Sequence, residues 1–466
     1  MTIRFDWSFV NDLLALSGPE AFWYFFKYGG GVVILLTVLW GIYKVYIYNM
    51  QLRNMASHDY ILLAIDIPKD SEQTPKAVEH LFAHLAGAHS SLSRREQYLF
   101  GKVQKWFSLE IASIEGYVQF FIRTSSKFRD LVEASIYAQY PDAEITEVED
   151  YTYLVPVKKF PDPEWDMWGV DFILVKDQAY PLRTYPQFEH GLTQEFKDPM
   201  SAMLENLSLL GRGEHLWFQI IIIPIGQKTW KAQGDKLVKK LIGAKVEEKP
   251  TGLDKILQIP ATILGPFFEQ IFSSAEETRP KQREFEPISK MLYLSPGESD
   301  AVKAIEGKLS KIGYKTKLRG IYIAKKEVMK KSRGANPLVG AIKQFNTVNL
   351  NSLKPELSKT GVSSSILLFK KRRLISRKNF LLSSYRFRDA TAPTSPYVLN
   401  TEELASLWHF PSIEVKAPFV KKTEAKKGEP PMMLPYEREV RVQEKRAQPA
   451  TEEYPADLPP NLPIEK

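Results

Sequence analysis

The residues best suited to do chemistry lie in one short basic segment, "FKKRRLISRK", which runs from Phe369 to Lys378. Lysine and arginine side chains bind phosphate and carboxylate groups, so this segment predicts an anionic partner. On a helix, Arg373 and Arg377 would lie one turn apart and repel each other, and an anionic partner would relieve that repulsion. The residues that we expect to bind this partner are Lys370, Lys371, Arg372, Arg373, Arg377 and Lys378.

Three kinds of anionic partner fit this segment, and one further interpretation needs no partner. Phe369, Phe380, Tyr385 and Phe387 are interleaved with cations. Such mixtures suit single-stranded nucleic acid, whose bases stack and whose phosphates pair. They also suit anionic lipid, at about 1 kcal/mol per cation, or the acidic face of a protein. The remaining interpretation is a solvated helix whose aromatic side chains face the core.

The charge of the surrounding sequence is strongly asymmetric. Between residues 301 and 390 there are 22 Lys and Arg residues against 4 Asp and Glu residues, whereas the whole chain of 466 residues carries a net charge of only +8. The rest of the chain is therefore acidic overall. An imbalance of this size favours an anionic partner for the basic region.

No catalytic or cofactor motif accompanies the basic segment. The strings "FGKV" and "EGKL" lack the upstream glycine and the hydroxyl residue of a phosphate-binding loop, and "GRGEHL" fails the dinucleotide fingerprint. The chain has no cysteine, which excludes thiol catalysis and thiolate metal sites. His80 and His84 have a spacing that metal ligands use, with His89 nearby, but we interpret them as an exposed helix face. We expect no enzyme activity, no cofactor and no metal.

An apolar run, "YGGGVVILLTVLWGIYKVYIYNM", occupies residues 28–50 and is interrupted only by Lys44. About 20 such residues can cross the hydrocarbon layer of a bilayer as a helix. The run therefore predicts a single-pass transmembrane helix behind an N-terminal lead, residues 1–27. A secretory signal peptide and a buried core helix are the alternatives. The charges on the two sides favour a cytoplasmic location for the bulk of the chain.

Strand and helix periods alternate after this run. Residues 59–150 give the βαββαβ order of a ferredoxin-like domain. Residues 151–355 repeat a similar order around an insertion, residues 245–286, and predict a second ferredoxin-like domain. Glu147, Glu149 and Asp150 are interpreted as a solvated strand edge. The expected fold class is therefore α+β.

A basic helix and a docking segment are expected over residues 356–420, followed by a disordered tail rich in Pro, Glu and Lys over residues 421–466. In the segment "LNTEELASLWHFPSIEVKAP", Asn400 and Glu403 can form a capping box, and Pro411 ends the helix. The apolar face of this helix needs a cover. We expect it to dock a partner through Leu404, Leu407, Trp408 and Phe410.

Three stretches together resemble one family. They are "DPMSAMLENLSLLGRGEHLWFQIIIIP", "GIYIAKKEVMKKSRGANPLVGAIKQFNTVNLNSLKP" and the docking segment quoted above. They look like bacterial membrane-anchored proteins related to type IV secretion and conjugation, and this resemblance implies a location at the bacterial inner membrane. In that family a similar region precedes a HerA/FtsK-like ATPase, on the same or a neighbouring polypeptide, and the region itself has no assigned activity.

The resemblance implies an accessory role, because no Walker motif follows the docking segment here. The role that it implies is a membrane-anchored, non-enzymatic scaffold of a secretion or conjugation-like machine that docks a separately encoded HerA/FtsK-like ATPase. The basic region supports an alternative, a membrane-tethered DNA-binding protein that guides a strand to a translocation pore.

Overall fold

The computed structural model describes residues 31–68, 73–188, 198–243, 294–359 and 369–411, together with residues 20, 23, 24 and 26. Most of the N-terminal lead over residues 1–27 lies outside these ranges. So do the expected insertion over residues 245–286 and the expected disordered tail over residues 421–466. All the described residues belong to one unit, Met1–Ala425, and a second unit comprises Lys426–Lys466.

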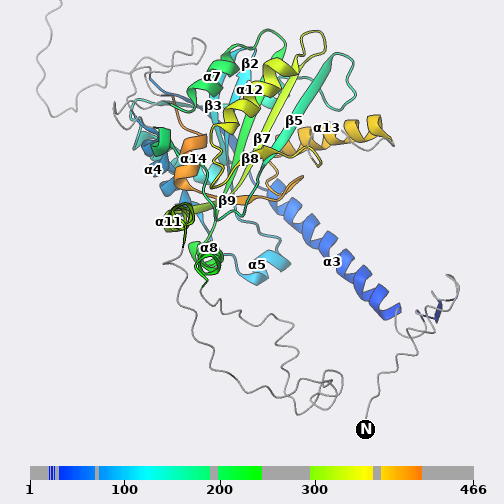
Figure 1. The fold of residues 1–466 in the computed structure, drawn as a ribbon. Helices are drawn as coiled ribbons and strands as arrows, with labels where there is room; N and C mark the ends of the chain where they lie inside the picture. The colour runs from blue at the N-terminus through cyan, green and yellow to red at the C-terminus, as the bar shows by residue number, and fades with distance from the viewer. Residues whose placement is uncertain are drawn as a thin grey trace, which may run out of the picture. The chain divides into compact units, whose positions relative to one another are not determined.

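A nine-stranded antiparallel sheet forms the centre of the first unit (Figure 1). Eight strands follow one another in the order β4-β1-β3-β2-β6-β7-β5-β8, and β9 pairs with β7. The strands are β1 (Tyr60–Asp66), β2 (Phe107–Ile114), β3 (Tyr117–Ser125), β4 (Glu144–Val148), β5 (Trp165–Leu174), β6 (Glu214–Pro224), β7 (Gly313–Lys325), β8 (Leu353–Pro355) and β9 (Tyr397–Asn400).

The sheet consists of two halves with the same pairing order. The first half reads β4-β1-β3-β2 and the second reads β8-β5-β7-β6, so each is a pair of interleaved split βαβ units. Strands β2 and β6 join the halves, from the pair Phe107–Ile222 to the pair Ile114–His215. Both strands are buried along most of their length, and leaving either as an open edge would expose unpaired backbone groups.

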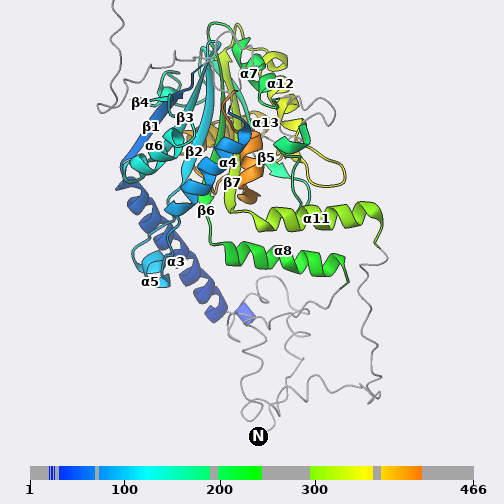
Figure 2. The ribbon, with the colours of Figure 1, turned by 90° about the vertical axis from the view of Figure 1, so that its left-hand side faces the viewer.

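This arrangement corrects the expected fold in one respect. The two βαββαβ halves are not two separate ferredoxin-like domains, because one continuous sheet runs through both. Strand β5, "WDMWGVDFIL", begins the second half. It is not among the strands that were predicted from the sequence. Helices α8 and α11 lie between β6 and β7 in the sequence, and they lie side by side in Figure 2.

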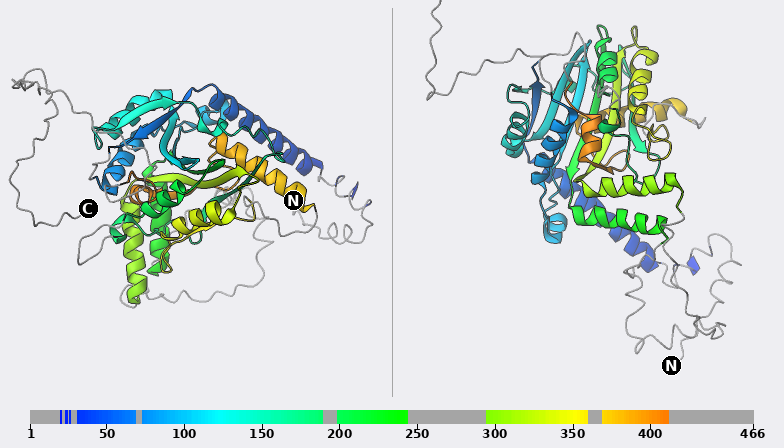
Figure 3. Two further views of the ribbon diagram at one scale, coloured as in Figure 1. Left: turned by 90° about the horizontal axis from the view of Figure 1, so that it is seen from above. Right: turned by 60° about the vertical axis from the view of Figure 1, so that its left-hand side comes forward.

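Helices lie on both faces of the sheet (Figure 3). One face packs against α4, α6, α7, α12 and α14, and the other packs against α13 and the segment 151–165. The helices are α3 (Gly31–Ala56), α4 (Pro75–Leu85), α5 (Arg94–Leu99), α6 (Arg129–Tyr137), α7 (Ser201–Ser208), α8 (Gln227–Leu241), α11 (Pro296–Ser310), α12 (Lys331–Lys343), α13 (Lys370–Arg386) and α14 (Thr401–Leu407).

The expected transmembrane helix must also be corrected. None of the helices in the described part of the chain combines the length and the apolar character that a bilayer span requires. Helix α3 contains residues 31–50 of the apolar run, but its C-terminal half carries Lys44, Asn49 and Arg53 and leads into the sheet. Met55, near the end of α3, packs against a small cluster that includes Trp106.

Candidate functional site: a buried charge clamp and the basic helix that it holds

A row of polar side chains crosses the face of the sheet that α13 covers. Glu110 of β2 is paired with Gln219 of β6. Gln219 is paired in turn with Arg319 of β7, and Arg319 with Asp171 of β5. All four residues are buried. Each interrupts a strand that is otherwise mostly apolar, so each needs a partner within the protein.

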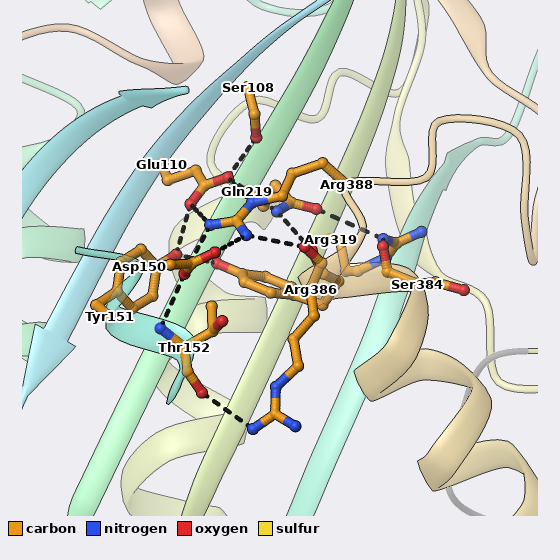
Figure 4. Close-up of polar contacts among 11 residues, drawn as sticks. Ser108, Glu110, Asp150, Tyr151, Thr152, Gln219, Arg319, Ser384, Arg386 and Arg388 are labelled. Carbon is orange, nitrogen blue, oxygen red and sulfur yellow. Dashed lines mark hydrogen bonds and ion pairs between the residues drawn. The ribbon is translucent and has the colours of Figure 1, made fainter. Parts of the chain in front are cut away.

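Arg388, which follows α13, binds the Glu110 end of this row (Figure 4). Its Nε lies 2.9 Å from Oε1 of Glu110 and its Nη2 lies 3.0 Å from Oε2, which makes a bidentate ion pair. Its Nη1 also pairs with the carboxylate of Asp150, just beyond β4. The side chain of Arg388 is fully buried. One guanidinium therefore ties β2 to the segment after β4.

The carboxylate of Glu110 is bonded on both oxygens. Ser108 Oγ donates to Oε1 at 2.5 Å, and Gln219 Nε2 donates to the same oxygen at 3.0 Å. Tyr151 donates its hydroxyl to Oε2 at 2.8 Å, and the hydroxyl of Tyr385 lies 2.7 Å from that of Tyr151. These bonds compensate the loss of water around a buried carboxylate.

The other end of the row holds the end of α13 and the chain segment that follows it. Asp171 accepts from Nε of Arg319 at 2.8 Å and from the hydroxyl of Thr394 at 2.8 Å. The remaining nitrogens of Arg319 donate to the carbonyl oxygens of Ser384 and Ala392, each at 2.7 Å. Residues 384–394 are thus attached to the middle of the sheet by charged side chains. We call Glu110, Asp150, Asp171, Gln219, Arg319 and Arg388 the clamp.

The acidic groups of the clamp are stabilised in their charged forms by the basic groups beside them. Burial alone would raise the pKa of Glu110, but the charge of Arg388 and the hydrogen bonds hold that pKa below its usual value. The pKa of Asp150 is lowered in the same way against the effect of its burial. Burial lowers the pKa of Lys317, which pairs with Asp171 at 3.0 Å, to about 8. The two acids with lowered pKa values are therefore ionised at neutral pH and stay paired.

The clamp attaches parts of the chain to one another. The hydrogen bonds and ion pairs described above join its charged groups to one another and to the segment 384–394. The described ranges contain no group of three or more acidic, histidine or cysteine side chains that could hold a metal ion. His80, His84 and His89 are exposed.

Further contacts fix the C-terminal half of α13. Lys378 forms an ion pair with Asp166 of β5. Asn379 accepts from the backbone N–H of Phe160 at 2.6 Å and donates to its carbonyl oxygen at 2.8 Å. Arg386 donates to the carbonyl oxygen of Val157 at 2.8 Å. This half of the helix is therefore held against the segment 151–165 and β5.

The six basic residues predicted from the sequence separate into two groups. Lys370, Lys371 and Arg372 are exposed, whereas Arg373 and Arg377 are half-buried and Lys378 is buried in its ion pair. The exposed group lies at the N-terminal end of α13, which points away from the sheet in Figure 1. Phe369, just before the helix, is 72% exposed.

The N-terminal end of α13 is electrostatically suited to an anion. Its first turn contains no acidic residue, and Phe369 at the N-cap makes no side-chain bond to the helix. The first backbone N–H groups of a helix lack internal partners and carry partial positive charge. Cations at this end are unfavourable beside the positive end of the helix dipole. An anionic group bound there would interact favourably with the cations and with the first backbone N–H groups.

The segment expected to dock a partner lies in the core. Leu404, Leu407, Trp408 and Phe410 are all almost fully buried, and α14 packs against α4. The ring of Trp408 lies 5.0 Å from that of Phe410 and 6.2 Å from that of Phe82. The predicted capping box between Asn400 and Glu403 is present. The apolar face therefore has its cover within the same chain and presents no docking surface.

Buried polar pairs hold this segment in place. Lys308 of α11 forms a fully buried ion pair with Glu403, at 2.9 Å. His409 Nε2 lies 2.8 Å from Oδ1 of Asp198. Both pairs join the C-terminal part of the described chain to elements that precede it by many residues.

None of the predictions made from the sequence includes the clamp, although lone polar residues in apolar strands were a signal for it. Asp150 was interpreted as part of a solvated edge, but it binds Arg388 because the segment after β4 turns under α13. Glu110, Gln219 and Asp171 each stand alone in a run of apolar residues. A lone polar residue in a buried strand must have a partner, and several such residues could have been matched with one another.

Comparison with known proteins gives a family and no function. Residues 51–423 match a family described as a domain of unknown function (DUF8128), which covers the whole sheet, α13 and α14. No curated protein matches the chain.

Proposed function

Since the chain belongs to this family of unknown function, we propose from its architecture that the protein is a non-enzymatic scaffold. Its exposed basic helix end docks the acidic face of a partner protein. Following the resemblance of the sequence, that partner is a separately encoded HerA/FtsK-like ATPase of a secretion or conjugation-like machine. The observation that carries the proposal is the position of Lys370, Lys371 and Arg372 at the projecting end of a helix whose other end is clamped.

Two features make this arrangement suitable for docking. The C-terminal half of α13 is bonded to the sheet through Lys378, Asn379 and Arg386, so its N-terminal half is held in a defined direction. The exposed cations and the uncapped helix start add two sources of positive potential at one place. Complementary charge raises the rate and the specificity of association between proteins.

The test uses the full-length protein and the purified candidate ATPase. Replacing Lys370, Lys371 and Arg372 by Gln should weaken binding at least tenfold and reduce its dependence on salt. Replacing Lys236, Lys239 and Lys240 of α8 by Gln removes the same charge from another exposed helix and should leave binding unchanged. Equal binding by the wild type and the α13 variant would exclude α13 as the docking element.

A second candidate is single-stranded DNA binding. It is favoured by the exposed rings of Phe369, just before the helix that carries the cations, and of Phe380, within it; they are 72% and 50% exposed. Exposed aromatic rings beside cations suit stacked bases and phosphates. Fluorescence anisotropy with a labelled oligonucleotide should then show affinity that falls steeply with salt, and Phe369→Ala should weaken it. No binding at low salt would exclude this function.

We also propose that α3 contacts lipid. Exposed apolar side chains follow one another along most of this helix and include Leu36, Leu39, Trp40 and Ile42, each at least half exposed. A contiguous exposed apolar surface of this kind is typical of a site that contacts a membrane or another protein. Full-length protein should float with vesicles of zwitterionic and anionic lipid in a density gradient. If the protein instead stays at the bottom as a defined oligomer, the cover is a second copy and the proposal fails.

A further inference from the structure

Helix α5 lies beside α3 in Figures 1 and 2, and none of its six residues is buried. A surface helix of a globular protein usually turns an apolar face to the core. In α5 the apolar residues Tyr98 and Leu99, with Phe100 directly after them, are instead 48%, 57% and 55% exposed. The proposed docking role of α13 gives this helix no purpose.

The conformation of α5 is fixed despite this exposure. Ser93 and Glu96 form a capping box at its start. After its end, the backbone N–H of Lys102 donates to the carbonyl oxygen of Glu96 at 3.0 Å, and Nζ of Lys102 lies 2.9 Å from Oε1 of Glu96. A helix that is bonded on both sides presents its apolar side chains in defined directions. Their exposure is therefore a property of the fold.

The turn after α5 lies against the backbone of α3. Gly101 is buried and has a φ of +60°, and a Cβ at this position would lie 2.6 Å from the carbonyl carbon of Met50. Only glycine allows so close an approach in this conformation. Tyr48 and Leu52, on either side of Met50 in the sequence, are 58% and 42% exposed. The apolar side chains of α5 therefore extend the exposed apolar surface of α3.

The charges of this surface are almost all positive. Helix α3 carries Lys44 and Arg53 and no acidic residue. The capped helix and its turn, residues 93–102, add Arg94, Arg95 and Lys102 against Glu96 alone. Glu96 is already paired with Lys102, whereas Arg94 and Arg95 are exposed. Apolar side chains beside exposed cations fit the surface of a bilayer that contains anionic lipid.

A second copy of this chain fits the surface less well. Two copies that met through α5 would bring the same cations together, and like charges repel each other. Anionic lipid offers the opposite charge for the arginines and an apolar layer for the side chains next to them.

We propose that α5 binds the headgroups of an anionic membrane surface. Arg94 and Arg95 pair with lipid phosphates, while Tyr98, Leu99 and Phe100 lie at the boundary with the acyl chains, a depth that suits tyrosine. This inference rests on the proposed contact of α3 with lipid. It adds to that contact the class of lipid and the residues that select it.

Flotation of the full-length protein with two kinds of vesicle tests the class of lipid. One kind contains phosphatidylcholine alone, and the other contains phosphatidylcholine with phosphatidylglycerol. We expect about tenfold tighter binding to the anionic vesicles, and this preference should decrease as salt is added. Equal binding to both would overturn the inference and leave the contact of α3 with lipid standing. No binding to either would overturn both.

Replacing Arg94 and Arg95 by Gln should remove most of the preference for anionic vesicles and leave binding to phosphatidylcholine unchanged. Both side chains are exposed, so thermal unfolding should stay as in the wild type. Replacing Lys330 and Lys331, at the start of α12, by Gln removes the same charge from another exposed place and should not alter binding. An undiminished preference in the α5 variant would overturn the proposal.

A fluorescent label shows whether the apolar side chains of α5 reach the lipid. The chain has no cysteine, so Leu99→Cys provides a single thiol for a polarity-sensitive dye. We expect its emission to shift to shorter wavelength when anionic vesicles are added. Leu209→Cys, at a side chain that is 59% exposed at the end of α7, is the matched control and should not respond. No shift at Leu99, or the same shift at both positions, would overturn the proposal.

Discussion

Arg388 and Glu110 stand 278 residues apart in the sequence and form a two-bond ion pair in the middle of the sheet. The pair is fully buried, and Asp150 shares the same guanidinium. Attachment of α13 therefore depends on a charge that has no access to water. This contact is therefore one of those that link the stability of the fold to the direction of the basic helix.

Removing Arg388 should be costly. Arg388→Met leaves Glu110 and Asp150 without their main counter-charge, and breaking a buried pair in this way typically costs about 3–5 kcal/mol. We expect the free energy of unfolding, measured by urea denaturation, to fall by that amount. Arg129→Met breaks exposed pairs with Glu133 and Glu147 and should cost about 0–1 kcal/mol for each pair. Similar losses in the two variants would contradict the buried clamp.

The clamp should also weaken in acid. The pKa of Glu110 in the folded protein lies below its ordinary value of 4.5, so on acidification the unfolded chain takes up this proton first. The stabilisation is therefore complete above about pH 4.5 and is lost as the pH falls through the lowered pKa. The free energy of unfolding should fall more steeply below pH 4.5 in the wild type than in Glu110→Gln. Parallel pH profiles would show that Glu110 is not paired in solution.

A charge reversal at the start of α13 should stabilise the protein and weaken docking. Lys371→Glu replaces a cation that opposes the helix dipole with an anion that favours it, worth about 0.3–1 kcal/mol. Thermal unfolding should shift upward while binding of the acidic partner declines. Lys236→Glu, in the interior of α8, carries the same charge change and should leave binding of the partner unchanged. A destabilised Lys371→Glu variant would mean that the helix start is already paired.

Trp408 should behave as a core residue. Its ring is buried among Phe82, Phe120 and Phe410, so Trp408→Ala should lower the free energy of unfolding by about 3–5 kcal/mol. Phe387→Ala, at a side chain that is 73% exposed, is the control and should change stability little. A Trp408→Ala variant of normal stability that had lost only partner binding would restore the docking interpretation.

The sequence predicted the parts of this fold that depend on local patterns. Asn400 and Glu403 have capping-box spacing, and the box is present. The α+β character follows from alternating periods, which are local as well. The sequence did not show that "FSLEIASI" and "HLWFQIIII" pair across the two halves, because nothing local encodes which strand lies next to which.

The candidate site shows the same division. The basic character of α13 was readable from residues 370–378, but the division of that segment was not. Lys378 is buried because Asp166, 212 residues away, lies beneath it. Likewise the apolar face of Leu404 and Trp408 called for a cover, and only the position of α4 shows that the cover belongs to the same chain.

The attachment of residues 384–394 to strands made much earlier has a consequence for biosynthesis. Glu110 and Asp171 emerge from the ribosome long before Arg388 and Thr394, so during translation these acids have no counter-ions and the apolar face around them stays open. We expect the nascent polypeptide to remain a substrate for chaperones until residues near 410 have been released. Premature stop codons within the last described helices should then yield proteolysed fragments rather than shortened, folded products.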